Sequence, residues 1–283
     1  MATPFATPRA RALGFGLRKC REDRDVGVRQ LAKLVGVHAQ EVSNWEYAKR
    51  VPRVEQVALV MGVLVVEPGE RARLLELART AAEPSWLEKQ VPGVAPSASA
   101  YAEHERAAIA MVDWEPMVIP GLLQTPDYTR ALLGAGDLPP PRVETVLQAR
   151  MARRNVLTRQ EPLDYHVLVG ESALRSEVGG AQVMAEQLRY LREVSARRNI
   201  RLQVLPVRSG AHAGLFGNFA VLDFGTLPPI VFMELYQASA YLYDDDQVAG
   251  YRAAAAKMAA LAMNERDSAE FIGEVIADLG GNP

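Results

Sequence analysis

The chain has few of the side chains that build covalent or metal-bound frameworks. Its 283 residues include one cysteine, Cys20, and four histidines. A single cysteine excludes an intramolecular disulfide and any metal site with several cysteine ligands. The histidines stand far apart, and no two of them have the HxxxH spacing that grips zinc. We therefore expect neither a metal nor a cofactor.

Long apolar runs and a secretory signal are also missing. No run of about 18 apolar residues, the length that spans a bilayer, occurs in the sequence. The opening MATPFATPRARA lacks an apolar core flanked by positive charge. We expect a protein of the reducing cytoplasm with no membrane partner. Cys20 continues an apolar helical stripe, which predicts a small buried hydrophobe rather than a reactive thiol.

The chain as a whole has no large excess of either charge, because its formal net charge is −2. Its parts differ, however. Residues 1–80 carry 14 Lys and Arg against 9 Asp and Glu, whereas the remainder carries 18 against 25. This difference indicates that the basic N-terminal part (the head) and the acidic remainder (the body) have different functions.

The basic head is predicted to be a series of short helices. Apolar residues recur at helical spacing through Leu13, Leu17 and Cys20, and breaks fall at Gly27 and Gly36. Further helices are predicted at 28–35, 39–47, 54–64 and 68–82. Five short helices with short turns describe a compact all-α domain. The predicted organisation is a flexible leader at 1–9, a helical domain at 10–82, a Pro- and Gly-containing linker at 83–97 and a regulatory domain at 98–283.

The acidic body mixes helices with strands. Helices are predicted at 97–113, 126–133, 141–159 and 180–198, and strands at 165–169, 200–207, 218–224, 230–236 and 240–243. The first two strands flank a helix and should run parallel, and the later ones should form an antiparallel meander. Closing helices at 245–263 and 267–279 should cover one sheet face. The predicted fold class is α+β overall, with an all-α five-helix head and an α+β body whose mixed sheet is flanked by helices.

The strongest functional signal lies in residues 26–52. The first short helix there has an apolar face, and Gly36 permits the sharp turn that ends it. A second helix, from Ala39, places Val42 and Trp45 inward. Two short helices joined by a Gly-containing turn are the helix-turn-helix pattern. The apolar face of the first helix is assigned to Val28, Leu31, Ala32 and Leu34.

The outer face of the second helix carries chemistry that suits DNA. Gln and Asn offer a donor and an acceptor side by side, which matches the adenine edge in the major groove. Basic residues beyond this helix can neutralise phosphates, and Glu46 is better explained as an internal partner of an arginine, with Arg18 as the candidate. The candidate DNA-binding residues are Arg29, Ala39, Gln40, Ser43, Asn44, Tyr47, Lys49 and Arg50.

Periodicity alone would equally fit a small helical bundle with a polar surface. The residues themselves resemble the XRE family of phage-repressor and Cro-like helix-turn-helix proteins over about residues 10–66. The family ending, Ser-x-x-Glu followed by a basic turn and Pro, stands here as SNWEYAKRVP. Two positions depart from the family, because Gly27 and His38 replace the usual Ser or Thr at helix starts. Positions that carry the resemblance are Leu13, Leu17, Arg18, Arg21, Leu31, Ala32, Gly36, Val37, Val42, Ser43, Trp45, Glu46, Lys49, Arg50 and Pro52.

The body, from about 98 to 280, is similar to actinobacterial XRE-type regulators of the WhiJ-like group. The resemblance rests on VIPGLLQTPDYTRALL, GESALRSEVGGAQVMAEQLRYL, QVLP and GAHAGLFGNFAVLDF. It implies transcription regulation in development or antibiotic production. It also implies, in many members, a small partner protein encoded next door in an antitoxin–toxin-like arrangement. It supplies no catalytic residue.

Three roles are open for the body. Catalysis would need the few acid–base groups near strand ends, Glu171, Glu234, His212 and Asp223, and no catalytic or nucleotide-binding motif accompanies them. We expect no enzyme. A small-molecule sensor and a protein-docking module remain alternatives. The candidate ligand or partner residues are His212, Phe216, Phe219, Glu171 and Glu234.

These observations predict a sequence-specific transcription regulator that binds a double-stranded DNA operator. One head buries little surface, so we expect a homodimer on half-sites roughly 34 Å or a multiple apart, with dimer contacts in the body. The alternative is an antitoxin-like protein that mainly neutralises a small neighbour-encoded protein. A DNA-tethered enzyme ranks last.

Overall fold

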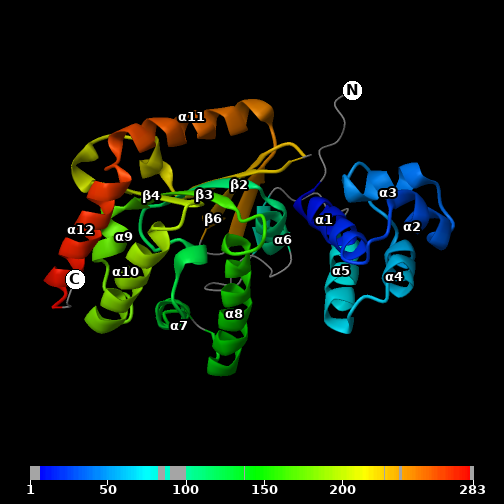
Figure 1. Cartoon of the computed structure of the whole chain (residues 1–283), viewed down its shortest axis with the longest axis horizontal. Helices are drawn as coiled ribbons and strands as arrows, with labels where there is room; N and C mark the ends of the chain where they lie inside the picture. The colour runs from blue at the N-terminus through cyan, green and yellow to red at the C-terminus, as the bar shows by residue number, and fades with distance from the viewer. Residues whose placement is uncertain are drawn as a thin grey trace. The chain divides into compact units, whose positions relative to one another are not determined.

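The structure of the chain is a computed structural model that describes residues 7–81, 87–89, 100–136, 138–225, 227–235 and 238–280. The chain divides into two compact units (Figure 1). The first comprises residues 1–88 and 96–107, and the second comprises residues 89–95 and 108–283. Most of the predicted leader and linker lies outside the described residues.

The first unit is all-α within the part of the chain that the structure describes. Its helices are α1 (Pro8–Glu22), α2 (Val28–Val35), α3 (Ala39–Glu46), α4 (Val54–Val63), α5 (Pro68–Thr80) and α6 (Ala100–Ala107). The five helices predicted for the head are confirmed. Helix α1 begins earlier than expected, because the Thr7 hydroxyl accepts a hydrogen bond from the Ala10 N–H and Pro8 suits a first helical position. Residues 7–9 therefore start α1 rather than belonging to a leader.

One apolar cluster holds these helices together. Leu13, Leu31, Trp45 and Leu74, from four different helices, are each at most 3% exposed. Burial raises the pKa of Cys20 to about 11, so its thiol stays protonated, as expected of a small core hydrophobe.

The predicted apolar face of α2 is wrong at one position. Leu34 is 53% exposed, whereas Val35 is buried beside Leu31 and Ala32. Residues i, i+1 and i+4 form one stripe on a helix, and Leu34 falls just outside it. Leu34 thus contributes an apolar side chain to the surface of the head.

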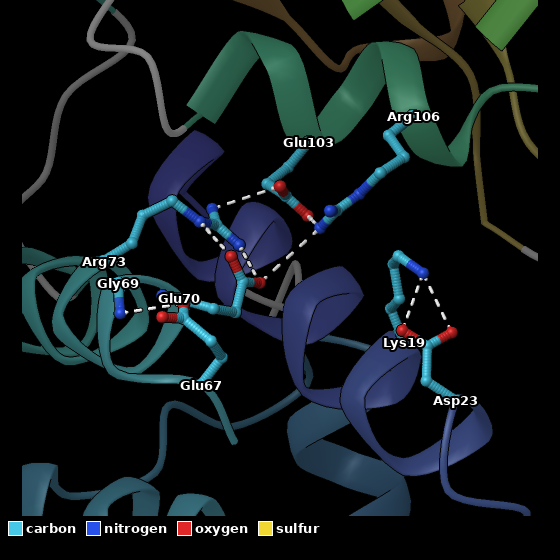
Figure 2. A network of polar contacts seen from close by, with 8 residues as sticks. All are labelled: Lys19, Asp23, Glu67, Gly69, Glu70, Arg73, Glu103 and Arg106. Atoms are coloured by element: carbon cyan, nitrogen blue, oxygen red, sulfur yellow. Dashed lines mark hydrogen bonds and ion pairs between the residues drawn. The ribbon is translucent and has the colours of Figure 1, made fainter. Parts of the chain in front are cut away.

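Helix α6 packs against α1 in the first unit, although it falls within the predicted body at 98–283. Figure 2 shows the polar network that fastens it. Arg73 on α5 binds Glu70 at 2.6 Å and 2.9 Å, and its third nitrogen lies 3.1 Å from the Glu103 carboxylate on α6. Arg106 bonds to Glu103 as well. Because Glu103 is 4% exposed, this ion-pair network is largely shielded from water.

The single helix predicted over 97–113 is wrong in its second half. After α6, residues Ala110–Glu115 form strand β2. This strand pairs with β3 on one side and with β5 on the other, so two ladders of hydrogen bonds override the local helical pattern. Met111 and Trp114, which have a helical spacing, lie on opposite faces of a strand.

The second unit contains a mixed sheet. Its strands are β2 (Ala110–Glu115), β3 (Asp164–Gly170), β4 (Ile200–Leu205), β5 (Phe219–Asp223), β6 (Ile230–Leu235) and β7 (Ala238–Leu242), in the order β7-β6-β5-β2-β3-β4. The short strand β1 (Leu87–Lys89), where the two units divide, extends the order beyond β7. Strands β2, β3 and β4 run parallel, and β5, β6 and β7 form an antiparallel meander. The predicted α+β class, the parallel pair and the meander are confirmed.

Helices cover both faces of this sheet (Figure 1). Helix α11 (Asp245–Leu261) packs on one face against Trp114, Phe219 and Val231, and α10 (Ala181–Ser195) lies on the opposite face. Helix α12 (Glu265–Asp278) packs instead on α10 and β4, where the Ser268 hydroxyl accepts a hydrogen bond from the Val204 N–H. The prediction that the two closing helices share one face is therefore wrong. The other helices are η1 (Gly121–Leu123), α7 (Pro126–Gly134), α8 (Pro140–Arg153), η2 (Arg154–Leu157), α9 (Glu171–Arg175), η3 (Val207–Ser209) and η4 (Ala213–Phe216).

Candidate nucleic-acid interface

The turn between α2 and α3 depends on one glycine. Gly36 ends α2 with a φ of 71°, in the left-handed region that side chains disfavour, and its N–H donates to the Ala32 carbonyl. Helix α3 then begins after His38, whose side chain makes no capping bond, and α2 begins after Gly27 in the same way. The two departures from the XRE pattern thus leave both helix starts without a side-chain cap.

Helix α3 is held on the bundle by a buried ion pair. The Glu46 carboxylate accepts two hydrogen bonds from Arg21, at 2.6 Å from Nε and 2.8 Å from Nη2. The third guanidinium nitrogen of Arg21 donates to the Val26 carbonyl at 3.0 Å. Both side chains are almost fully buried, and such a bidentate pair fixes orientation as well as distance.

The predicted internal arginine partner of Glu46 is confirmed, but it is Arg21 and not the candidate Arg18. Arg18 forms an exposed pair with Glu22 at 2.8 Å, and its guanidinium lies 6.0 Å from the Tyr47 ring centroid. Arg21 lies one turn further along α1. There its guanidinium reaches both Glu46 and the backbone just before α2. Helical spacing alone does not distinguish the two arginines.

The outward face of α3 presents two linked amides. The Gln40 Nε2 donates a hydrogen bond to the Asn44 Oδ1 at 3.0 Å, one helical turn away. This bond leaves the Gln40 carbonyl oxygen, its second N–H and both N–H groups of Asn44 available. Donors and acceptors are thus presented in one fixed order, as recognition of base edges requires.

Basic and aromatic side chains gather at the end of α3. Tyr47 follows the helix, and the Lys49 ammonium lies 5.9 Å from its ring centroid. Arg18 approaches the same ring, so an aromatic residue contacts two cations at once. Arg50 extends into solvent with its guanidinium 3.9 Å from Glu41. Sequence reasoning missed Arg18 as a member of this group, because its contact with Tyr47 joins two helices that are distant in sequence.

The remaining predicted residues lie on the same two helices. Ala39 and Ser43 are half-buried on α3, next to the exposed Gln40. Arg29 is exposed near the start of α2. The helix-turn-helix and the turn that follows it therefore carry every predicted DNA-binding residue. Ala39, Gln40, Ser43 and Asn44 lie on α3, Tyr47, Lys49 and Arg50 follow it, and Arg29 lies on α2.

Two protein families match the chain. Residues 12–74 match a family described as a helix-turn-helix domain. Residues 98–274, more than half of the chain, match a family described as a domain of unknown function, DUF5753. The chain belongs to the DUF5753 family. No curated protein and no solved structure matches it. The helix-turn-helix domain at the N-terminus supports a DNA-binding regulator.

The DUF5753 domain does not bring the predicted body residues into one site. Phe219 is 4% exposed and packs in the core under α11, with its ring 5.0 Å from Tyr251. Phe216, in contrast, is 96% exposed. His212 contacts the edge of the Trp114 ring, and the Trp114 indole donates to the Gly214 carbonyl.

The predicted carboxylates Glu171, Asp223 and Glu234 have surroundings separate from one another. Glu171 accepts hydrogen bonds from Arg175 and from the Val207 N–H, and Arg175 lowers the pKa of this carboxyl. Asp223 is paired with Arg252. Glu234 is exposed on β6. It lies near Glu115, a residue that sequence reasoning missed because β2 was predicted as helix. Among the described helices, none is long and apolar enough to cross a membrane.

Proposed function

We propose that this chain is a sequence-specific transcription regulator of the WhiJ-like kind, acting in the cytoplasm as a homodimer. The observation that carries the proposal is the fixed amide pair, Gln40 and Asn44, on the exposed face of α3. Helix α3 enters the major groove, and Lys49, Arg50 and Arg29 contact phosphates on either side. A single recognition helix reads few bases, so two heads act on a pseudo-palindromic operator. A monomer in sedimentation, both free and on DNA, contradicts the dimer.

The DUF5753 domain acts as the regulatory part rather than as an enzyme. Support comes from the connection between the units, because only two residues separate the end of α6 from the start of β2. Helix α6 is ion-paired to α5 through Glu103 with Arg73 and through Arg106 with Glu70, and β2 is a central strand of the sheet. A ligand or partner that shifts β2 therefore has a short covalent route to the head.

The test is binding of the purified full-length protein to its own upstream intergenic DNA against a scrambled duplex. At about 150 mM salt weak phosphate contacts are screened. A specific regulator should prefer its operator by roughly 10³ or more. If selection from a genomic fragment library also yields no preferred sequence, the proposal fails.

Substitutions on α3 should separate base reading from phosphate binding. Gln40→Ala and Asn44→Ala should each cost roughly 1–3 kcal/mol on the operator and relax preference at particular base pairs. Because the two amides share a hydrogen bond, the double variant should lose less than the sum of the single losses. Lys49→Ala should weaken operator and scrambled DNA alike. Competition titrations measure all four variants, and equal losses on both DNAs for every variant contradict the assigned roles.

A second candidate function, antitoxin-like capture of a small neighbour-encoded protein, has one specific observation in its favour. Apolar side chains are exposed in loops at the edge of the sheet where β2 and β4 end and β5 begins. They are Met117, Val207, Leu215 and Phe216, each at least 60% exposed. Exposed apolar groups that share one edge are typical of docking surfaces.

Phe216 offers the test of this second function. Phe216→Ser removes the most exposed apolar side chain and, since its ring contributes nothing to the core, should leave stability within about 0.5 kcal/mol. The variant should lose co-purification with the neighbour protein and keep operator binding. Unchanged co-purification, or no complex even with the native chain, excludes docking at this edge.

A further inference from the structure

One face of the sheet in the second unit carries acidic residues beside buried aromatic ones. Trp114 on β2 packs under α11, so its neighbours Asp113 and Glu115 point to the opposite face. Asp113 is 5% exposed and accepts a hydrogen bond from the Tyr165 hydroxyl at 2.5 Å.

The strand register aligns polar residues in a row across this face. Strand β2 pairs Trp114 with Phe219, β5 pairs Ala220 with Phe232, and β6 pairs Glu234 with Ser239. When each pairing is extended along its strands by one or two residues, four polar side chains fall opposite one another on four neighbouring strands. The acidic row consists of Glu115, Asn218, Glu234 and Ser239. The Asn218 amide donates to the Glu115 carboxylate at 3.3 Å, as this alignment requires.

Ser239, at the end of the acidic row, has an unsatisfied hydroxyl. The residue is 0% exposed, and its Oγ has no hydrogen-bond partner among the described residues. Its side chain lies on the same face as that of Glu234, since directly opposed residues of an antiparallel pair point the same way. A buried hydroxyl without a partner is costly, and proteins retain such groups where something else completes the bond.

Among the described residues, the two carboxylates of the row also have no neutralising partner. Neither Glu115 nor Glu234 forms an ion pair with a basic side chain in the described part of the chain. Burial, together with the charges of Asp113 and Glu234, raises the pKa of Glu115 well above its usual range. A bound cation would relieve this repulsion.

The spacing of these carboxylates favours an organic cation over a metal ion. No group of three or more His, Cys, Asp or Glu side chains among the described residues is close enough to hold a metal. Glu115 and Glu234 stand two strands apart, about 10 Å.

We propose that the acidic row binds a small organic molecule that carries two or more ammonium groups and a hydroxyl or carbonyl acceptor. Glu115 and Glu234 pair with the ammonium groups, and the Ser239 hydroxyl donates to the acceptor. This inference rests on the proposed regulatory function and names the effector class. Because Glu115 lies on β2, binding acts on the strand that follows α6.

The test is calorimetric titration of the full-length protein without DNA. The first probe is 2-deoxystreptamine, a ring with two amino groups and several hydroxyls, and myo-inositol is the same kind of ring without amines. The second probe is spermidine, which has ammonium groups but no acceptor. Both amines should bind, and myo-inositol should not.

Variants then locate the binding. Glu115→Gln should weaken the binding of both amines about tenfold or more, as expected for loss of a charged hydrogen bond. Ser239→Ala should weaken the binding of 2-deoxystreptamine severalfold but leave the affinity for spermidine unchanged. Glu193→Gln removes an exposed carboxylate from α10 of the same unit and should change neither affinity. No binding of either amine, or equal binding by native protein, Glu115→Gln and Ser239→Ala, overturns the proposal.

The melting temperature distinguishes loss of binding in these variants from unfolding. Glu115→Gln removes a carboxylate whose charged form is disfavoured in the fold, and Ser239→Ala removes an unsatisfied hydroxyl, so both should raise the melting temperature. Operator binding is measured separately on the same proteins. A chain that binds amines but shows no preferred DNA contradicts the proposed function alone, and a chain with an operator but no amine binding contradicts the site alone.

Discussion

Glu46→Ala should unfold the head of this regulator or bring it close to unfolding. The substitution leaves the buried Arg21 guanidinium without its bidentate carboxylate, with only the Val26 carbonyl at 3.0 Å and the exposed Glu22 carboxylate at 3.4 Å still bonded to it. Loss of one partner of a buried ion pair costs about 3–5 kcal/mol, a large part of the stability of a small domain. Chemical denaturation of the full-length chain should show a separate early transition, and operator binding should fall with the folded fraction of the head.

Two further variants make this expectation specific. Glu76→Ala removes an exposed carboxylate that pairs with Arg79 on α5 and should cost less than about 1 kcal/mol. The double variant Arg21→Met with Glu46→Leu replaces the buried pair by apolar side chains and should recover most of the lost stability. If Glu46→Ala is as mild as Glu76→Ala, the ion pair does not hold α3 in place.

The head could be predicted largely from its sequence because its signals are local. Helical periodicity, Gly36 at the turn and the inward Val42 and Trp45 all act within a few residues. The errors arose where contacts join distant segments. Spacing did not decide whether Arg18 or Arg21 meets Glu46, since that depends on how α1 crosses α3.

The later strands of the body could be predicted from the sequence, but its polar site could not. The crossover from β3 to β4 and the later meander follow from chain order and short links. Strand β2 was missed, because a six-residue strand placed in the sheet centre has no local signal that outweighs helical spacing. With β2 predicted as helix, Glu115 could not be aligned with Glu234 and Ser239.

Placement of α6 bears directly on regulation. A domain boundary drawn from composition assigned this helix to the body, whereas its packing and ion pairs belong to the head. The family match to DUF5753 begins at residue 98 and therefore includes α6. The family segment thus starts in the head and continues into β2, a central strand of the sheet. Coupling between the units requires a continuous segment of this kind.

Gly14→Ala should be the second strongly destabilising substitution, although alanine has a higher helix propensity than glycine. A Cβ at position 14 of α1 would lie 2.7 Å from the Glu46 carbonyl oxygen and 2.8 Å from that of Trp45. Both atoms belong to the backbone at the end of α3 and cannot move aside as a side chain can. Overpacking of this kind costs roughly 1–3 kcal/mol, which exceeds the gain of about 1 kcal/mol in helix propensity.

Gly62→Ala provides the matched comparison, because Gly62 lies inside α4 and a Cβ there would meet no atom within 4 Å. The same change at this position should stabilise the head by about 0.5–1 kcal/mol. Opposite shifts in the denaturation midpoint show that close backbone contact between α1 and α3 decides the effect at position 14. Since that contact sets the angle of α3, Gly14→Ala should also weaken operator binding more than its loss of stability explains, whereas Gly62→Ala should not. Two shifts of the same sign contradict this explanation.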